Sequence, residues 1–449
     1  MSDLLQIGRT GVLAYQNALA AVGQNVVNAE TPGYARRQVR QNEVTGGRPQ
    51  PLQRSNINFN GVITVGVQRM WDTYKATDAR MGASDAGRAD ARSRWLSTLE
   101  TALDDGPIGV GKQLTAVFNA GDALAADPAS AAPRRQFLLA IDGAAGALRA
   151  TATHLATAAA GIHAEATTAL NAANNALAAL VQVNRQLHRA SPGSTAQAEA
   201  MDQRDLLLDD LSRHIGYVAT FDAAGAVELT SDGATGQTLL DGVNPVTIGM
   251  GRAADGRLSF SLADATGAPQ VLSLTGGSLA GLQDAANVSA DRRLTLDAIA
   301  TDFANQLNAW SAAGRDKGGA PGAALLAPGA GKAATIAAIP TDPDDVAAAS
   351  AISANGNAIA LGNLRGAGGL EARWSATVSN HAQILAAARA EASAATTRRD
   401  NAFAARDSES GIDLDAEAAD LLRFQQAYSG SAKVIQAARE TLQDILNLF

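Results

Sequence analysis

Two amphipathic helical repeats stand at opposite ends of this chain. In each of them apolar residues recur every three or four positions, which predicts a helix with one apolar stripe. Each stripe could pack on the body of its own chain. Because the second stripe continues to the last residue, we instead expect other subunits to complete its apolar contact. The N-terminal stripe consists of Val12, Tyr15, Leu19, Val22 and Val26, and the C-terminal stripe of Leu421, Phe424, Tyr428, Ile435, Leu442, Ile445 and Phe449.

A turn motif, Asn28, Pro32, Gly33 and Tyr34, follows the first repeat. Pro32 restricts the residue before it and Gly33 tolerates a positive φ, so the helix should stop here in a tight turn. Farther along, residues 57–67 have the composition of a strand. The Asn-Gly pair at 60–61 is the candidate hairpin turn of that strand.

The middle of the chain changes from a helical to a strand pattern and back. Residues 72–216 are predicted to be helical. They include helices at about 113–126 and 201–215, and between these one helix that begins after Pro133 and a second, long one that carries Leu170 and Leu187. In 217–275 apolar residues instead alternate with polar ones between turn clusters. Helix returns after Gly277, residues 314–372 are expected to be irregular, and two helices close the chain. The predicted fold is α+β, mainly α. It comprises a terminal coiled-coil domain (1–40 plus 410–449), a helical body (41–216 plus 276–409) and an inserted antiparallel β domain (217–275).

Composition narrows the classes of partner. The chain has 44 acidic against 36 basic residues and a net charge of −8, which argues against nucleic acid. It contains no cysteine, so disulfides and thiol chemistry are excluded. No apolar run reaches about 18 residues, so no membrane span is expected. The first residues lack a basic segment followed by an apolar core, so we expect no cleavable secretory signal.

Searches for catalytic, cofactor and metal motifs lead to no predicted site. Residues 106–113, GPIGVGKQ, begin like a phosphate-binding loop, but Gln113 stands where serine or threonine should reach magnesium. A helix-breaking loop is the better interpretation. The five histidines form no zinc-binding helix motif. We therefore predict no catalytic residue, no cofactor and no metal.

Two charged clusters invite a functional interpretation. Asp202, Arg204 and Asp205 concentrate charge on one predicted helix, where a structural ion-pair network or a solvated face is far more common than catalysis. Arg36 and Arg37, just after the turn, are expected to face solvent or to pair with acidic residues of a neighbouring subunit.

The two ends of the chain resemble a known protein family. NAETPGYARRQV, from residue 28, resembles the turn of bacterial flagellar axial proteins, the group of rod, hook and hook-associated proteins. GIDLDAEAADLLRFQQAYSGSAKVIQAARETL, from residue 411, resembles the C-terminus of the hook-associated protein 1 family. MDQRDLLLDDL at 201–211 and ANQLNAW at 304–310 resemble the same family in the same order.

The resemblance implies a structural role at the hook–filament junction of the extracellular flagellum. The terminal helices would pair into an inner domain that lines a tube, in a ring of about eleven subunits. The implied partners are further copies of the chain, the hook protein, a second hook-associated junction protein, and the flagellar type III export apparatus, which would read the N-terminal region. An export chaperone would shield Phe424, Tyr428, Ile435 and Leu442 before assembly.

Three alternatives stay open. The chain could be another axial protein, hook or distal rod, although the LLRFQQAY ending favours the junction protein. It could be a secreted enzyme carried on flagellar termini, which would need a catalytic constellation in 217–372. It could also be an intracellular helical scaffold, which would leave the NAETPGY resemblance unexplained.

Overall fold

The computed structural model describes residues 2–45, 59–242, 244–263, 268–327, 329–366 and 368–447. The predicted class, mainly α with small antiparallel sheets, is confirmed. The chain forms two compact units, which we call the terminal unit (residues 1–85, 172–247 and 396–449) and the central unit (residues 86–171 and 248–395). Three helices contribute residues to both: α2 (Thr73–Ala102), α4 (Ala131–Arg189) and α8 (Leu370–Ser410).

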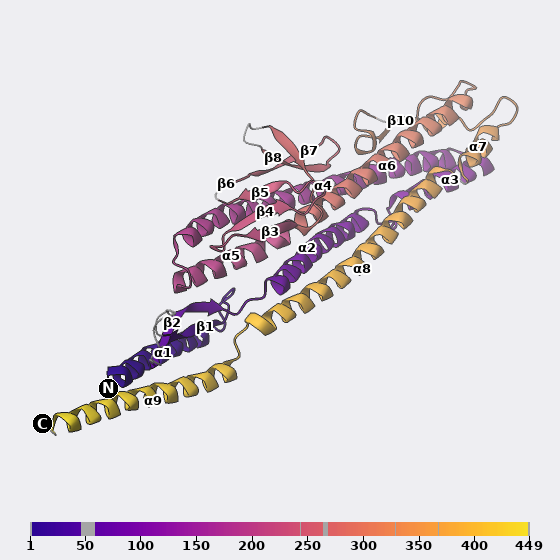
Figure 1. The fold of residues 1–449 in the computed structure, drawn as a ribbon. Coiled ribbons are helices and arrows are strands. Elements are labelled where there is room, and N and C mark those ends of the chain that lie inside the picture. Colours follow the sequence, from indigo (N-terminus) through magenta and orange to yellow (C-terminus); the bar gives the residue numbers. More distant parts are fainter. Residues whose placement is uncertain are drawn as a thin grey trace. The chain divides into compact units, whose positions relative to one another are not determined.

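The two ends of the chain meet in the terminal unit. Helix α1 (Ser2–Val27) and helix α9 (Leu414–Leu446) lie side by side and run antiparallel (Figure 1). Glycines permit the close approach, because a Cβ at Gly8 would lie 2.6 Å from Cγ1 of Ile435. A Cβ at Gly11 would lie 2.7 Å from Oγ of Ser431. These glycines weaken α1 as an isolated helix, but any larger residue would force the two helices apart.

A two-stranded hairpin packs on α1. Strand β1 (Arg37–Thr45) pairs antiparallel with β2 (Phe59–Arg69), with Arg37 opposite Arg69 and Val39 opposite Val67. The predicted hairpin turn at 60–61 is wrong, because both residues lie inside β2. Gly61 has a positive φ of 81°, as a turn glycine would, but it lies within β2 and lets that strand approach Thr10 of α1. The sequence did not indicate β1, since most of its residues are polar.

The helices between residues 72 and 216 follow the sequence prediction, except for the longest one. Helix α5 (Thr195–His214) and α3 (Val110–Ala126) follow the predicted stripes. Residues 131–189, expected to hold two helices, instead form the single 59-residue helix α4. Its glycines do not end it, because tertiary contacts stabilise the helix beyond its intrinsic propensity. At Gly161, for example, the ring of Trp95 packs where a side chain would otherwise stand.

Residues 217–275, expected as one β domain, fold as two antiparallel sheets in different units. The terminal unit contains the sheet of β3 (Tyr217–Phe221), β4 (Val227–Ser231), β5 (Thr238–Asp241) and β6 (Asn244–Pro245), in that order. Buried Asn184 of α4 fastens this sheet, since its amide donates to the carbonyls of Val227 and Gly242 at 2.8 and 2.6 Å. The central unit contains the sheet of β7 (Ile248–Arg252), β8 (Leu258–Ala263) and β9 (Pro269–Leu272).

The central unit holds the largest apolar core. Side chains of α2, α3, α4, α6 (Gly277–Ala313) and α8 surround the buried rings of Phe137, Trp310 and Trp374. Where the structure describes it, the predicted irregular stretch before α8 contains only short elements: β10 (Leu326–Ala327), β11 (Ala337–Ala338), α7 (Gly356–Ala360) and the 3-10 turns Lys332–Ala334, Pro343–Asp345 and Leu361–Leu364. Among the described residues, no helix combines the length and apolarity needed to cross a bilayer.

One buried histidine makes the central unit sensitive to acid. His381 of α8 is 1% exposed, and its Nε2 lies 2.8 Å from the carbonyl oxygen of Leu96. A carbonyl only accepts, so Nε2 carries the proton of the neutral ring. Burial lowers the pKa of His381, and the nearby Arg292 guanidinium lowers it further, against the opposing effects of the Leu96 carbonyl and Glu100.

We expect the free energy of unfolding to fall as the pH drops below about 6.5, the pKa of an unperturbed histidine. Below that pH the unfolded chain takes up a proton that the folded chain resists, until the lowered folded-state pKa is reached. Thermal unfolding between pH 8 and 5 should therefore depend less steeply on pH in His381→Gln than in the parent chain. His154→Gln, at an exposed position of α4, is the control. Equal pH dependence in the parent and His381→Gln would contradict this assignment.

Candidate functional site at the terminal junction

The turn after α1 is held by its own side chains. The backbone N–H of Thr31 donates to the carbonyl of Asn28 at 3.0 Å, and the Asn28 amide donates to the carbonyl of Gln24 at 2.9 Å. Gly33 has a φ of +79°, the left-handed conformation expected from the sequence. Pro32 is exposed, whereas the ring of Tyr34 turns inward and its hydroxyl donates to Oδ1 of Asn25 at 3.0 Å.

Asn25 connects three segments of the terminal unit. Its side chain is 1% exposed and uses both ends of the amide. Oδ1 accepts from the backbone N–H of Arg37 at 2.9 Å, while Nδ2 donates to the carbonyl of Arg37 at 2.9 Å and to Oε2 of Glu417 at 3.1 Å. The end of α1, the start of β1 and the start of α9 are therefore tied together at one side chain. Sequence analysis missed Asn25, because a polar residue within an amphipathic helix normally faces solvent.

Glu417 is the acidic partner at this point. Its side chain is fully buried, and Oε1 accepts from Nε of Arg36 at 2.5 Å. Arg36 also lies 3.3 Å from Asp420, one turn farther along α9. The expectation that Arg36 faces solvent or a neighbouring subunit is therefore wrong. Both carboxylates come from the same chain, nearly 400 positions away in sequence, where no local pattern could reveal the pairing.

The side chain of Arg37 is buried, and it belongs to a larger network of ion pairs. Its Nη2 lies 2.9 Å from Asp202 of α5, which is also 2.8 Å from Arg69. The prediction that the Asp202 cluster forms a structural ion-pair network is confirmed. The alternative in which Arg37 faces solvent or another subunit is wrong, because the carboxylate of α5 completes its pairing within this chain.

Asp205 is the centre of that network. Three arginines bind its carboxylate: Arg69 at 2.9 Å, Arg80 at 3.0 Å and Arg204 at 2.8 Å. Burial alone would raise the pKa of Asp205, but the guanidiniums of Arg204, Arg80 and Arg69 outweigh it and hold that pKa below its ordinary value.

The neighbouring Asp202 behaves in the opposite way. Burial raises its pKa above the ordinary value in spite of Arg69 and Arg37. Asp205 is thus the carboxylate that fixes the network in its charged form. Removing one partner of such a buried pair is costly, because the other charge is left without compensation.

The predicted stripes are only partly buried by the α1–α9 contact. In α1, Val22 is buried, Val12, Tyr15 and Leu19 are half-buried, and Val26 is exposed. Apart from Val22 and Asn25, the buried positions of α1 are small residues: Gly8, Gly11, Ala14, Ala18 and Ala21. In α9, Leu421, Phe424, Ile435 and Leu442 are half-buried, Tyr428 and Ile445 are exposed, and Phe449 lies outside the described residues. The rings of Tyr15 and Phe424 approach to a centroid distance of 6.4 Å.

Neither a phosphate-binding loop at residues 106–113 nor a metal site is supported by the described part of the structure. Asp105 accepts from the backbone N–H of Gly111 at 2.7 Å, so a carboxylate of this chain occupies the amide that a phosphate would need. Over the described ranges, no group of three or more His, Cys, Asp or Glu side chains is placed to hold a metal ion. The arrangement at the junction is suited to holding segments together rather than to transferring protons or groups.

Two family models match this chain. The model described as the helical domain of flagellar hook-associated protein FlgK matches residues 96–326, just over half of the chain. The model described as the C-terminal region of flagellar basal body rod FlgEFG proteins matches residues 406–448, which include all of α9.

Several curated relatives are similar over most of the chain. The flagellar hook-associated protein 1 of Bacillus subtilis is 24% identical over 494 aligned positions, which cover 99% of this chain and 97% of the relative. The proteins of the same name from Salmonella typhimurium and Escherichia coli are 24% and 23% identical over 72% and 73% of this chain. The chain spans only 59% and 60% of their lengths.

One solved structure has a similar fold. The flagellar hook junction protein FlgK from Burkholderia pseudomallei superimposes with a TM-score of 0.50 at 22% identity. The match covers 56% of this chain and 46% of that protein.

We expect Glu417→Ala to loosen the start of α9. The change leaves the Arg36 guanidinium and the Asn25 amide without their buried partner, at a cost of about 3 kcal/mol. Hydrogen exchange should accelerate in residues 414–424, and thermal unfolding of the terminal unit should begin earlier. Glu440→Ala, at an exposed position of the same helix, is the matched control. Unchanged protection of residues 414–424 in Glu417→Ala would show that Glu417 does not hold the junction together.

Proposed function

Because this chain belongs to the family of the flagellar hook-associated protein FlgK, we propose that it is a structural component of the bacterial flagellum that joins the hook to the filament. The proposal includes secretion through the flagellar export apparatus and a final location at the hook–filament junction outside the cell. It assigns no catalytic step to the chain. The relatives' names and the match over residues 96–326 support this role.

The observation that carries the proposal is the apolar surface that the α1–α9 pair leaves open. Leu13 is 51% exposed, Val27 83%, Leu422 59% and Leu446 68%. Large apolar side chains exposed together on one helix pair favour an interaction surface, because soluble proteins expose such residues mostly singly. The two helices approach closely at Gly8 and Gly11, and the four side chains named above stay outside that contact, where they can meet other subunits.

We propose that residues 1–40 and 410–449 together form the inner domain of an axial tube. In this arrangement the two predicted stripes contact equivalent helices of neighbouring copies in a ring of about eleven subunits. The hook protein would lie on one side of the ring and the second hook-associated junction protein on the other. Before assembly, an export chaperone would cover the C-terminal stripe at Phe424, Tyr428, Ile435 and Leu442, because an uncovered apolar stripe promotes premature association.

A second candidate, another axial protein of the rod or hook type, is favoured by one observation. Residues 406–448 match the C-terminal model of the rod and hook proteins. That model covers a small part of the chain, however, and the match over 96–326 is specific to the junction family. The two candidates differ in the position of the protein along the axis, so an assembly phenotype separates them.

Deleting the gene in its host should give complete hooks without filaments, with flagellin lost to the medium. The physical reason is that filament subunits would lack the surface on which they polymerise. Electron microscopy of the cells and an immunoassay of the medium measure both effects, and a plasmid copy of the gene is the control. Absent hooks would place the protein in the rod or hook, and normal filaments would refute an axial role.

Charge on the exposed stripe should block assembly without unfolding the chain. Ile445 is 41% exposed, so Ile445→Asp should leave the thermal unfolding of the purified chain nearly unchanged. In the proposed ring the new carboxylate would be buried against apolar side chains without a partner, which costs several kcal/mol. The variant should therefore not restore filaments to the deletion strain. Gln443→Asp, at an exposed position outside the stripe, is the control, and full restoration by Ile445→Asp would refute the proposed contact.

A further inference from the structure

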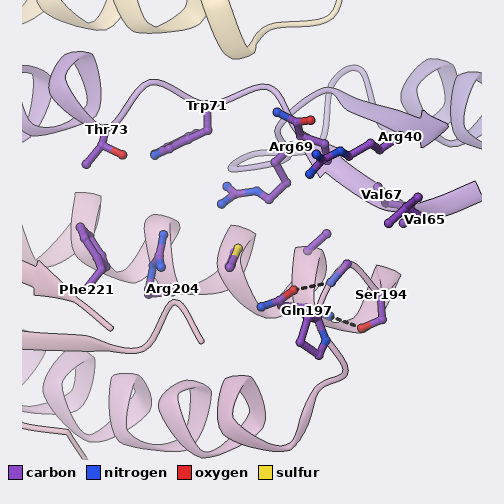
Figure 2. A pocket seen from close by; sticks show the side chains of 16 residues that line it. Arg40, Val65, Val67, Arg69, Trp71, Thr73, Ser194, Gln197, Arg204 and Phe221 are labelled. Carbon is purple, nitrogen blue, oxygen red and sulfur yellow. Dashed lines mark hydrogen bonds between the residues drawn. The ribbon is translucent and has the colours of Figure 1, made fainter. Parts of the chain in front are cut away.

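The terminal unit contains a cavity between strand β2 and helix α5 whose lining is basic. Its volume is about 580 Å³, and we call it the β2–α5 cavity. Figure 2 shows Arg69 projecting from β2 toward α5, with Trp71 beside it and Arg204 and Phe221 on the opposite wall. Arg40 of β1 borders the same space. The lining contains three arginines and no aspartate or glutamate.

The walls of the cavity are fixed by hydrogen bonds and close backbone contact. The N–H of Val67 donates to the carbonyl of Gly193 at 2.8 Å, and the N–H of Gly193 donates to Oε1 of Gln197 at 2.8 Å. A Cβ at Gly66 would lie 2.8 Å from the carbonyl oxygen of Gly193, so β2 and the loop before α5 approach as closely as glycine allows. A cavity built in this way is preformed, and a ligand would not have to order it.

The charges behind the cavity are balanced without Arg40. Within the described network five arginines pair with five carboxylates, so the two kinds of charge are equal in number. The arginines are Arg37, Arg69, Arg80, Arg204 and Arg406, and the carboxylates are those of Glu199, Asp202, Asp205, Asp209 and Asp407. Arg40 is exposed and forms none of the ion pairs found among the described residues. One positive charge is therefore left over at the cavity.

Arg69 adds a second, more deeply placed donor group. Its side chain is 6% exposed, with Nε 2.8 Å from Asp202 and Nη2 2.9 Å from Asp205. Its guanidinium lies 4.8 Å from the centre of the Trp71 ring, which holds it at the wall of the cavity. A planar, fixed guanidinium together with one that forms no ion pair among the described residues suits a carboxylate, whose two oxygens match the donor geometry of arginine.

We propose that the β2–α5 cavity receives an aspartate or glutamate side chain from a second copy of this chain. A single carboxylate would neutralise the excess charge of Arg40, and the volume admits the backbone on either side of it. The choice of a second copy rests on the proposed function. The residue after Arg40, Gln41, donates to the carbonyl of Ala14 in α1 at 3.2 Å, so the hairpin that lines the cavity also packs on the helix pair that is proposed to contact neighbouring copies.

Photo-cross-linking in the native host tests this proposal. Gln68 is exposed and lines the cavity, so a benzoylphenylalanine at position 68 samples the occupant while leaving Arg40 in place. We expect a covalent adduct of two copies, in which the captured peptide contains Asp or Glu. The same group at Arg185, at an exposed position of α4 outside the cavity, is the positional control.

Variants of Arg40 with altered charge test whether the cross-link depends on a carboxylate bound in the cavity. Arg40→Glu should reduce the adduct at least about tenfold through like-charge repulsion, whereas Arg40→Lys should retain it. Thermal unfolding of purified Arg40→Glu should match that of the parent chain, because the exposed side chain contributes no ion pair. An adduct that survives Arg40→Glu, a captured peptide without an acidic residue, an adduct with another protein, or no adduct would each overturn the proposal.

A small free anion is the competing occupant. If N-acetylaspartate raises the unfolding temperature of the purified parent chain but not that of Arg40→Glu, and no two-copy adduct forms in cells, the cavity binds a small carboxylate and the proposal is wrong. The cross-link is read in the host whatever the filament phenotype. Failure of the gene to restore filaments therefore counts against the proposed function, while loss of the cross-link result counts only against this inference.

Discussion

The terminal unit depends on the buried amide of Asn25 and the buried carboxylate of Glu417. Their hydrogen bond at 3.1 Å joins the end of α1 to the start of α9, and Arg36 neutralises the carboxylate. Without that arginine, Glu417 would be an uncompensated buried charge, a far larger cost than the net stability of most contacts. The turn at 28–34 is therefore needed chiefly because it places Arg36 and Arg37 between two acidic helices.

Small and large residues have different roles along the terminal helices. Gly8 and Gly11 of α1 permit the tight contact with α9, where they meet Ile435 and Ser431. Larger residues such as Leu13 and Leu422 keep much of their surface open. A seam of this kind holds a monomer together and still leaves apolar area for assembly, which a conventional interlocked pair of leucine stripes would bury.

Sequence patterns predicted what depends on local periodicity. The terminal helices, the helical middle and the alternating strands after residue 216 all follow from the spacing of apolar residues. The predictions that were wrong depended on contacts between distant segments. The Asn-Gly pair lies inside β2, where Gly61 contacts α1, and α4 continues through its glycines because neighbouring side chains pack on it. At the site, the Asp202 network was foreseen as structural, whereas Asn25 and Glu417 were not, since only folding reveals that they meet.

The Asn25–Glu417 contact joins residues 392 positions apart. Closing so long a loop is entropically unfavourable, and the contact can form only after almost the whole chain has been synthesised. Helix α1 therefore lacks its permanent partner while the residues between it and α9 are being translated. Its order of maturation is inverted: α1 leaves the ribosome long before α9, yet it reaches its native surroundings only after α9 has appeared.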